Sequence, residues 1–323
     1  MYRLWKLWKP GMFQGQGRKD NYFEGWYYKL VDKKLDNVFA VIPGISIKDN
    51  DRDTHAFIQV LDGKNAVSSY YDFSCRHFTY SKKGFDISIG KNHFSGKGMY
   101  LDIERGGIRA DIRFENTAGW PVRIFSPGAM GWYSFVPYME CYHGVLSMDH
   151  DLKGFMEIDK KEIDFGGGKG YIEKDWGTSF PEGWIWLQTN NFTSCQPCSL
   201  MLSIARIPWR GKSFTGFIGG FLYRGDFHIF ATYNGSRLEG LSYGTDGGVS
   251  VELTGKGRKL KIYATRKKSA RLASPVMGAM DGRIDESMDA EIRVSLSRSG
   301  RVVMEDCGRC GGFEMVRPQV LDV

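Results

Sequence analysis

The sequence predicts an all-β protein made of two tandem antiparallel domains. Glycine accounts for 41 of the 323 residues, about one in eight and well above the usual ~7%. The chain also holds 21 Phe, 16 Tyr and 9 Trp, and aromatic residues favour strands. Short segments such as 110–114 and 290–296 place an apolar residue at every second position, which is typical of half-buried strands.

An internal repeat predicts the domain organisation. Gly25-Trp-Tyr-Tyr-Lys-Leu30 resembles Gly183-Trp-Ile-Trp-Leu-Gln188, and four further pairs of segments follow in the same order. These pairs are 39–43 with 203–208, 55–61 with 215–222, 85–90 with 248–253, and 126–131 with 274–278. We interpret the repeat as a duplication, with a first β domain over 1–165, which includes a short N-terminal arm, and a second over 166–323.

Within each half, the segments between turn signals are short enough for strands. Turn-forming pairs such as Asp62-Gly63 and Asn234-Gly235 fit hairpins. Many antiparallel strands per half predict a sheet that closes into a small barrel or sandwich, and such barrels commonly hold one apolar ligand. Short helices are expected only near 126–140 and 274–289.

The net charge and the hydropathy of the chain indicate which kinds of partner and which location to expect. The net charge is +7, and the basic residues are scattered. The small cluster from Arg266 to Arg271 is interpreted as a solvated loop, so no nucleic-acid partner is expected. No stretch approaches 18 consecutive apolar residues, and no secretory signal opens the chain. We therefore expect a cytoplasmic protein.

The N-terminal arm alternates large apolar residues with Lys and Arg. Residues 1–10 read Met-Tyr-Arg-Leu-Trp-Lys-Leu-Trp-Lys-Pro, and neither face of this segment is purely apolar. Two interpretations stand: an arm packed on the body of the protein, which we favour, or a peripheral contact with a membrane surface.

Residues that could take part in acid–base chemistry are most concentrated near the boundary between the halves. In Met139-Glu-Cys-Tyr-His-Gly144, an extended backbone places Glu140 and Tyr142 on one face and Cys141 and His143 on the other. The same rule applied to 171–176 places Tyr171, Glu173 and Asp175 on one face, opposite Lys174 and Trp176.

A third segment adds aromatic and amide side chains. Trp184, Trp186 and Gln188 share one face of the strand predicted after 183, and the counterparts in the first half are Glu24, Trp26 and Tyr28.

Paired carboxylates beside large aromatic rings suggest proton chemistry in an apolar site. Burial and a second carboxylate both raise the pKa of a carboxyl group, and a protonated acid could then donate to carbon. The structural alternative pairs Glu173 with Lys174 or Lys169 and gives Asp175 a turn-capping role. His143, taken alone, is interpreted as a hydrogen-bonded structural histidine.

Two further motifs are interpreted as structural. Gly166-Gly-Gly-Lys-Gly170 lacks the spacing of a phosphate-binding loop and is predicted to be a flexible hinge between the domains. The pairs Cys195/Cys198 and Cys307/Cys310 could form a four-thiolate zinc site if they met in space. We expect free thiols instead, and no metal.

At these same residues the chain resembles the tocopherol cyclase family. The resemblance runs from about residue 20 to the end. Its motifs are Tyr22-Phe-Glu-Gly-Trp-Tyr-Tyr-Lys29, Ala40-Val-Ile-Pro-Gly-Ile-Ser46, His55-Ala-Phe-Ile-Gln-Val60, Ser126-Pro-Gly-Ala-Met-Gly-Trp132, Met139-Glu-Cys-Tyr-His-Gly144, Gly170-Tyr-Ile-Glu-Lys-Asp-Trp-Gly177 and Trp184-Ile-Trp186. It implies two lipocalin-type β domains in tandem, related to carotenoid hydratases and to cyclising enzymes of natural-product pathways.

The resemblance also implies a reaction: closure of a chromanol ring in a prenylated hydroquinone, without a redox cofactor or metal. Alkene protonation would be followed by attack of the phenol oxygen. As hypotheses, Asp175 or Glu173 donates the proton, and Glu140 or His143 orients or deprotonates the phenol. The predicted substrate-binding residues are Glu24, Trp26, Tyr28, Tyr142, Trp176, Trp184, Trp186 and Gln188.

Two alternatives remain open at this point. One is a related lyase that adds water to an isoprenoid double bond. The other is a lipocalin-like carrier of a hydrophobic metabolite. In every case the expected partner is a small hydrophobic molecule, and no oligomeric state is predicted.

Overall fold

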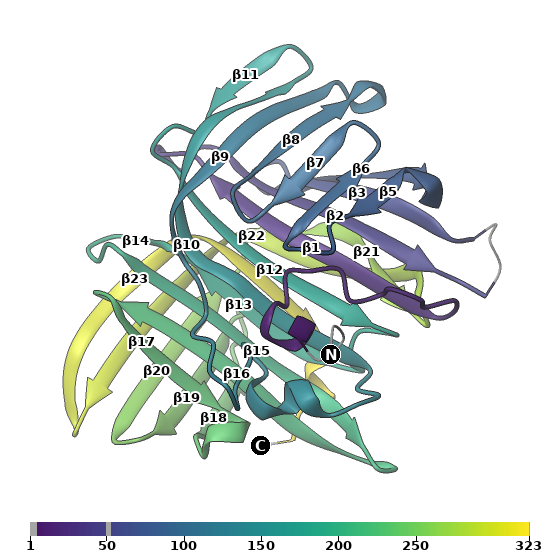
Figure 1. Ribbon diagram of the computed structural model, residues 1–323. Helices are drawn as coiled ribbons and strands as arrows, with labels where there is room; N and C mark the ends of the chain where they lie inside the picture. The colour runs from purple at the N-terminus through teal and green to yellow at the C-terminus, as the bar shows by residue number, and fades with distance from the viewer. Residues whose placement is uncertain (1–4, 50–52, 323) are drawn as a thin grey trace. The chain divides into compact units, whose positions relative to one another are not determined.

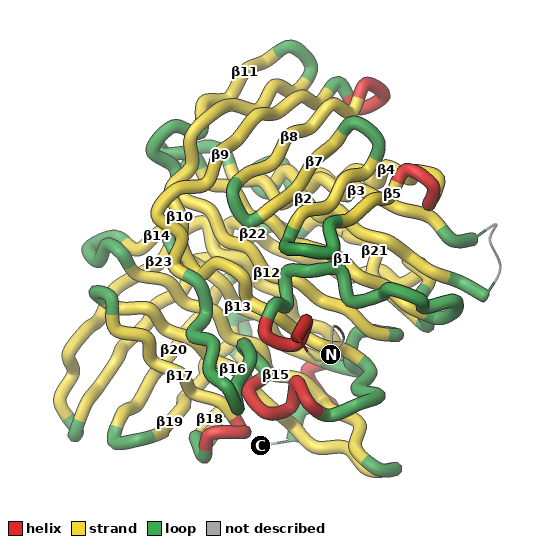
Figure 2. Tube along the Cα trace, in the orientation of Figure 1, coloured by secondary structure: helices red, strands yellow, loops and turns green. Residues whose placement is uncertain are grey.

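The computed structural model describes residues 5–49 and 53–322, and strands dominate it (Figure 1). The only helical elements among these residues are short 3-10 turns, drawn in red in Figure 2. Contacts divide the chain into two compact units. Unit 1 comprises Met1–Phe180 and Leu272–Arg283, and unit 2 comprises Pro181–Arg271 and Ile284–Val323. No helix of the described residues is long and apolar enough to cross a bilayer.

The first sheet has twelve antiparallel strands in the order β4-β3-β2-β1-β12-β10-β9-β8-β7-β6-β5, with β11 paired to β10. Their bounds are β1 Tyr22–Val31, β2 Val38–Ile47, β3 His55–Asp62, β4 Val67–Ser74, β5 Phe78–Tyr80, β6 Asp86–Ile89, β7 Asn92–Ser95, β8 Gly98–Ile103, β9 Ile108–Ala118, β10 Cys141–Ile158, β11 Lys161–Asp164 and β12 Lys169–Gly177.

The second sheet has eleven strands in the order β17-β16-β15-β13-β23-β22-β20-β19-β18, with β14 paired to β23 and β21 to β22. Their bounds are β13 Trp184–Thr189, β14 Asn191–Phe192, β15 Cys198–Trp209, β16 Lys212–Tyr223, β17 Asp226–Ala231, β18 Arg237–Tyr243, β19 Val249–Gly255, β20 Arg258–Thr265, β21 Ala270–Val276, β22 Ala279–Arg298 and β23 Arg301–Val316.

Six 3-10 turns complete the described elements. They are η1 Lys6–Trp8, η2 Cys75–His77, η3 Glu104–Gly106, η4 Gly131–Phe135, η5 Thr232–Asn234 and η6 Pro318–Val320.

Strand order confirms the predicted all-β fold of two tandem lipocalin-like domains. In the first sheet β1 lies between β2 and β12, and in the second β13 lies between β15 and β23. The first three repeat pairs therefore occupy equivalent strands: β1 and β13, β2 and β15, β3 and β16. The predicted boundary at 165/166 falls between β11 and β12, whereas the contacts divide the chain after Phe180 because β12 pairs with β1 and β10.

Each sheet packs alternate side chains into its own core, as strand geometry requires. The first core includes Trp26, Tyr28, Leu30, Val41, Ile58, Ile112 and Ile172. The second includes Ile185, Leu187, Leu202, Phe221, Val251, Ile292 and Phe313.

Two local predictions were wrong, and a third was confirmed. A short 3-10 helix, η4, lies within 126–140 as expected. Residues 274–289, however, belong to the hairpin of β21 and β22, which turns at Met277 and Gly278, both with positive φ. Gly166–Gly170 is no hinge between the units. It joins β11 to β12 within unit 1, and an added Cβ at Gly168 would lie 2.2 Å from the Val31 carbonyl oxygen.

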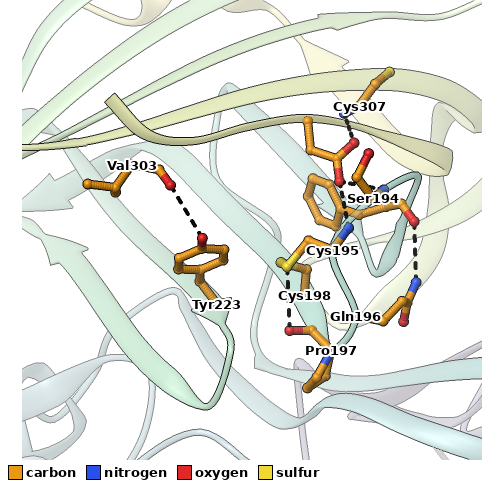
Figure 3. Close-up of a disulfide and its surroundings, with 10 residues drawn as sticks. Ser194, Cys195, Gln196, Pro197, Cys198, Tyr223, Val303 and Cys307 are labelled. Carbon is orange, nitrogen blue, oxygen red and sulfur yellow. Dashed lines mark hydrogen bonds between the residues drawn. A yellow bond between two sulfur atoms is a disulfide. The ribbon is translucent and has the colours of Figure 1, made fainter. Parts of the chain in front are cut away.

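The prediction of free thiols was wrong for one cysteine pair. Cys195 and Cys198 form a disulfide (Figure 3), whereas Cys75, Cys141, Cys307 and Cys310 are not in disulfides. The backbone N–H groups of Ser194 and Cys195 both donate to Asp306 Oδ2, which holds the start of this loop against β23. Their Cα atoms are 5.6 Å apart, within the range that a disulfide spans. The described cysteines thus offer no four-thiolate set.

Candidate active site

A histidine and two carboxylates meet on adjacent strands of the first sheet. His143 on β10 lies directly opposite Asp175 on β12, and Glu173 precedes Asp175 by one pleat. His143 Nδ1 lies 2.9 Å from Asp175 Oδ1, and His143 Nε2 lies 3.8 Å from Glu173 Oε2. The imidazole therefore sits between the two carboxylates.

Further polar groups surround this cluster. The Tyr171 hydroxyl donates to Glu173 Oε2 at 2.5 Å, and Cys141 Sγ lies 4.0 Å from Asp175 Oδ1. The side chains of Glu173, His143 and Asp175 are 7%, 14% and 23% exposed. Hence the face predicted to hold Tyr171, Glu173 and Asp175 carries all three, and the predicted pair of Cys141 and His143 faces them.

The charges of Asp175 and Glu173 influence whether the His143 imidazole is protonated. Burial opposes protonation of His143, but the charges of Asp175 and Glu173 and the hydrogen bond to Asp175 outweigh it and raise the pKa of His143 to about 9. Burial, followed by the charge of Glu173, raises the pKa of Tyr171 well above its usual value. At neutral pH the mobile proton is therefore on the imidazole, and Tyr171 remains a donor.

The same three residues could also hold a cation. One ligand atom from each of His143, Glu173 and Asp175 lies within 4.8 Å of the others, and nitrogen and carboxylate oxygen are ligands that zinc accepts. A cation there would compete with the proton on His143, because a metal-bound imidazole nitrogen must be deprotonated.

The opposite face of β12 is built around a buried ion pair. Lys174 Nζ lies 2.5 Å from Glu24 Oε1, and both side chains are fully buried. Glu24 also accepts hydrogen bonds from the backbone N–H groups of Gln14 and Gly15 and from the Tyr22 hydroxyl. The Glu24 carboxylate is thereby satisfied by four groups.

Lys174 ties the N-terminal arm to the first sheet. Its ammonium donates to the carbonyls of Pro10 and Met12 at 2.8 and 2.7 Å and lies 4.7 and 4.6 Å from the ring centres of Trp26 and Trp176. Burial lowers the pKa of Lys174 to about 8, although Glu24 opposes that shift. From residue 5 onward the arm is therefore packed on the body, as favoured from the sequence, whereas residues 1–4 lie outside the described residues.

Strand alternation separates the predicted site residues of unit 1 into two groups. Glu24, Trp26, Tyr28, Tyr142 and Trp176 lie on the Lys174 face: Trp26 pairs with Lys174 across the sheet, and Tyr142 stacks on Trp176 with ring centres 5.6 Å apart. These residues line the core of unit 1, on the face of β12 opposite Asp175.

Glu140 lies immediately before β10. Its carbonyl accepts from the backbone N–H of Thr178 at 2.8 Å, and its parity places it on the Tyr142 side.

In unit 2, Trp184, Trp186 and Gln188 share one face of β13, as predicted, and all three are buried. Trp184 Nε1 donates to Glu314 Oε2 at 2.6 Å, and the Trp186 ring covers Gly312, where an added Cβ would lie 2.4 Å from it. Glu314 was missed from the sequence because it becomes visible only once β23 is paired with β13.

Tandem lipocalin-like sheets with a buried histidine–carboxylate cluster define a two-domain β protein equipped for acid–base chemistry. The chain belongs to the tocopherol cyclase-like family, whose model matches residues 104–316.

Individual relatives are distant. The rice (Oryza sativa subsp. japonica) protein named "Probable tocopherol cyclase, chloroplastic" is 25% identical over 122 residues, 36% of this chain and 26% of its own length. The maize (Zea mays) chloroplastic tocopherol cyclase is 31% identical over 75 residues, 23% of this chain and 16% of its own. The chain thus matches about a quarter or less of each.

Solved structures share the fold. CghA, crystallised with Sch210972, superposes with a TM-score of 0.61 at 11% identity, covering 92% of this chain and 88% of its own. Kievitone hydratase from Nectria haematococca gives a TM-score of 0.50 at 11% identity, covering 94% and 93%.

Proposed function

We propose that this protein is an isomerase that closes a ring in a hydrophobic prenylated phenol, by adding the phenol oxygen across an isoprenoid double bond. The observation that carries the proposal is the His143–Asp175–Glu173 cluster, in which the imidazole lies between two carboxylates. Family membership supports the substrate class, since the relatives that the chain matches are named tocopherol cyclases.

In the proposed mechanism the proton donor is His143, which replaces the donor hypothesised from the sequence, Asp175 or Glu173. Asp175 Oδ1 lies 2.9 Å from His143 Nδ1, so Asp175 is placed to orient the ring. Glu173, held by the Tyr171 hydroxyl at 2.5 Å, is placed to accept the phenol proton. General acid–base catalysis of this kind contributes roughly 10²–10⁴-fold in rate.

The step balances without an external reactant. The alkene π bond and the phenol O–H bond break, while a C–H and a C–O bond form. Glu173 takes the proton that the phenol releases and passes it to His143 Nε2, 3.8 Å away, which restores the imidazolium. Because reactant and product are isomers, no oxidant or reductant takes part. Attack of the oxygen in concert with protonation avoids a free cation, which matters because an acid with a pKa near 9 is weak.

A hydratase is the second candidate, since a fold match covering 94% of this chain is with kievitone hydratase. The same imidazolium would protonate the alkene, and water would replace the phenol oxygen as nucleophile. The product would then be heavier than the substrate by one water, whereas a cyclised product has the substrate's mass.

The test is incubation with a prenylated hydroquinone in deuterated water, followed by mass spectrometry. A cyclase should give an isomer with one deuterium on carbon. His143→Gln should lower kcat by roughly 10²-fold or more, and Asp175→Asn and Glu173→Gln should each lower it. His93→Gln is the matched control, because it removes the exposed pair with Asp86 and should leave kcat unchanged. Normal turnover by His143→Gln would remove the proposed donor, and binding without turnover would indicate a carrier.

A further inference from the structure

Exposed apolar side chains gather on one part of unit 1. We call this set the aromatic surface, and it comes from the arm and from the segment between β9 and β10. Its exposed members are Trp5, Val122, Ile124, Phe125, Trp132, Phe135 and Tyr138. Exposed apolar side chains concentrated in two neighbouring segments are typical of an interaction site.

Direct contacts join the two segments. Trp8 Nε1 donates to the carbonyls of Arg123 and Ile124 at 3.2 and 3.1 Å, and the Trp8 ring meets Phe135 edge-on with centres 5.6 Å apart. Lys6 Nζ, itself buried, donates to the Phe13 carbonyl at 2.9 Å. The arm is therefore fixed against the 119–139 segment.

The most exposed members lie at the tip of a tight turn. The backbone groups of Arg123 and Ser126 bond in both directions, at 2.9 and 3.1 Å, so Ile124 and Phe125 form the tip. They are 73% and 83% exposed. Turn tips usually carry polar residues or glycine, so two large apolar side chains at this point need an apolar environment outside the protein.

The charge of this surface is of one sign. Residues 5–15 and 119–139 contain Lys6, Lys9 and Arg123 and no Asp or Glu. Lys9 Nζ lies 4.0 Å from the ring centre of Trp5, and Lys9 and Arg123 are exposed. Basic residues interleaved with Trp, Tyr and Phe suit a layer of anionic headgroups above an apolar interior.

We propose that the aromatic surface docks the protein on an anionic lipid bilayer, with Ile124 and Phe125 inserted below the headgroups and Lys9 and Arg123 at their level. A bilayer accounts for both the exposed apolar tip and the absence of Asp and Glu from residues 5–15 and 119–139. This inference is independent of the proposed catalytic function.

The test is co-sedimentation of the full chain with vesicles of phosphatidylcholine, alone or mixed with phosphatidylglycerol. The wild type should bind the mixed vesicles, and salt should weaken that binding. Ile124→Ser/Phe125→Ser should lower the partition coefficient by roughly tenfold or more. Val302→Ser/Val303→Ser is the matched control, because this adjacent pair is also exposed, at 60% and 44%, and should bind as the wild type does.

A second variant separates a loss of vesicle binding from a loss of folding. Lys9→Glu should weaken binding to the mixed vesicles only, and all variants should keep the wild-type Tm. The proposal is overturned if the wild type stays in the supernatant with both compositions, or if the Ile124/Phe125 variant binds normally. It is equally overturned if that variant abolishes self-association in the absence of vesicles, because the occupant is then a second copy of the chain.

Discussion

His143 is the residue on which the proposed chemistry depends, because its protonation state follows from its two carboxylate neighbours. A ring with an ordinary pKa would be mostly neutral at neutral pH. Between Asp175 and Glu173 it holds a proton up to a pH of about 9, at the cost of acid strength. The raised pKa therefore favours the protonated form of His143 at neutral pH and makes that form a weaker acid.

The raised pKa of His143 predicts a pH-dependent stability. A group whose pKa is higher in the folded state stabilises the protein fully below its unfolded pKa of about 6.5, and this contribution is lost as pH rises through about 9. The shift corresponds to about 3 kcal/mol. Urea unfolding between pH 6 and 9.5 should show this decline in the wild type, and His143→Gln should flatten it. Equal slopes in both proteins would contradict the assignment.

A second prediction concerns the buried ion pair. Lys174→Met leaves the Glu24 charge without its cation and should lower the free energy of unfolding by about 3–5 kcal/mol. Lys174→Met combined with Glu24→Gln should recover part of the loss, because no buried charge then remains. As a control, Lys259→Met breaks the part-exposed pair with Glu252 and should cost under about 1 kcal/mol. Chemical denaturation measures all three.

Residue-level inference from the sequence succeeded where it needed only local geometry. Alternation placed Glu173 and Asp175 together and placed Cys141 beside His143 on one face. It did not show that β10 and β12 are neighbours, so His143 taken alone was interpreted as structural. It also did not separate Trp26 from Asp175, because their relative faces depend on the register of β1 against β12.

At the scale of elements, β12 is the strand that organises unit 1. It lies between β1 and β10, so one of its faces carries the acid–base cluster and the other carries the ion pair that holds the arm. The strand ends at Gly177, where φ is +153° and an added Cβ would lie 2.2 Å from the Glu140 carbonyl oxygen.

Gly177→Ala should therefore push β10 away from β12 at the end nearest Asp175. We expect a loss of about 2–3 kcal/mol in the free energy of unfolding, together with reduced turnover. Gly84→Ala is the control, since nothing lies within 4 Å of the added Cβ there. Thermal unfolding and kcat should both separate the two variants, and matched values would show that the clash relaxes freely.

At the scale of the whole molecule, the chain does not divide at one point. The hairpin segment Leu272–Arg283 belongs to unit 1 although it follows most of unit 2 in sequence. The buried Gln59 side chain holds it: its amide donates to the Ala273 carbonyl at 3.1 Å and accepts from the Ala273 N–H at 2.9 Å. The Ser46 hydroxyl donates to the Gly278 carbonyl at 2.7 Å.

Gln59→Ala should leave both backbone groups of Ala273 without these bonds and cost about 2 kcal/mol. Amide hydrogen exchange should accelerate across the hairpin before it does so elsewhere in unit 1. Lys48→Ala offers the comparison, because Lys48 contacts the same hairpin at the exposed Met277 carbonyl and should change stability by under about 0.5 kcal/mol. An unchanged exchange rate at Ala273 would show that Gln59 does not hold the hairpin.

Two repeated β domains could be predicted from the sequence, because composition, alternation and the internal repeat can all be recognised without knowing long-range contacts. The packing of residues 272–283 in unit 1 could not be predicted. Ser274-Pro275 resembles Ser126-Pro127, which indicated a repeat element of the second half, whereas the hairpin's partners Gln59 and Ser46 lie more than two hundred positions away. Contacts between residues so far apart in the chain produce no recognisable pattern in the local sequence.

The alternation along β12 has a consequence for how this family varies. Neighbouring residues from 171 to 176 face different surroundings: the odd-numbered ones lie in the His143 cluster, and Lys174 and Trp176 lie on the face of the buried ion pair that holds the arm. Homologues that have drifted to new substrates should therefore differ at every other position of this strand and keep the intervening residues.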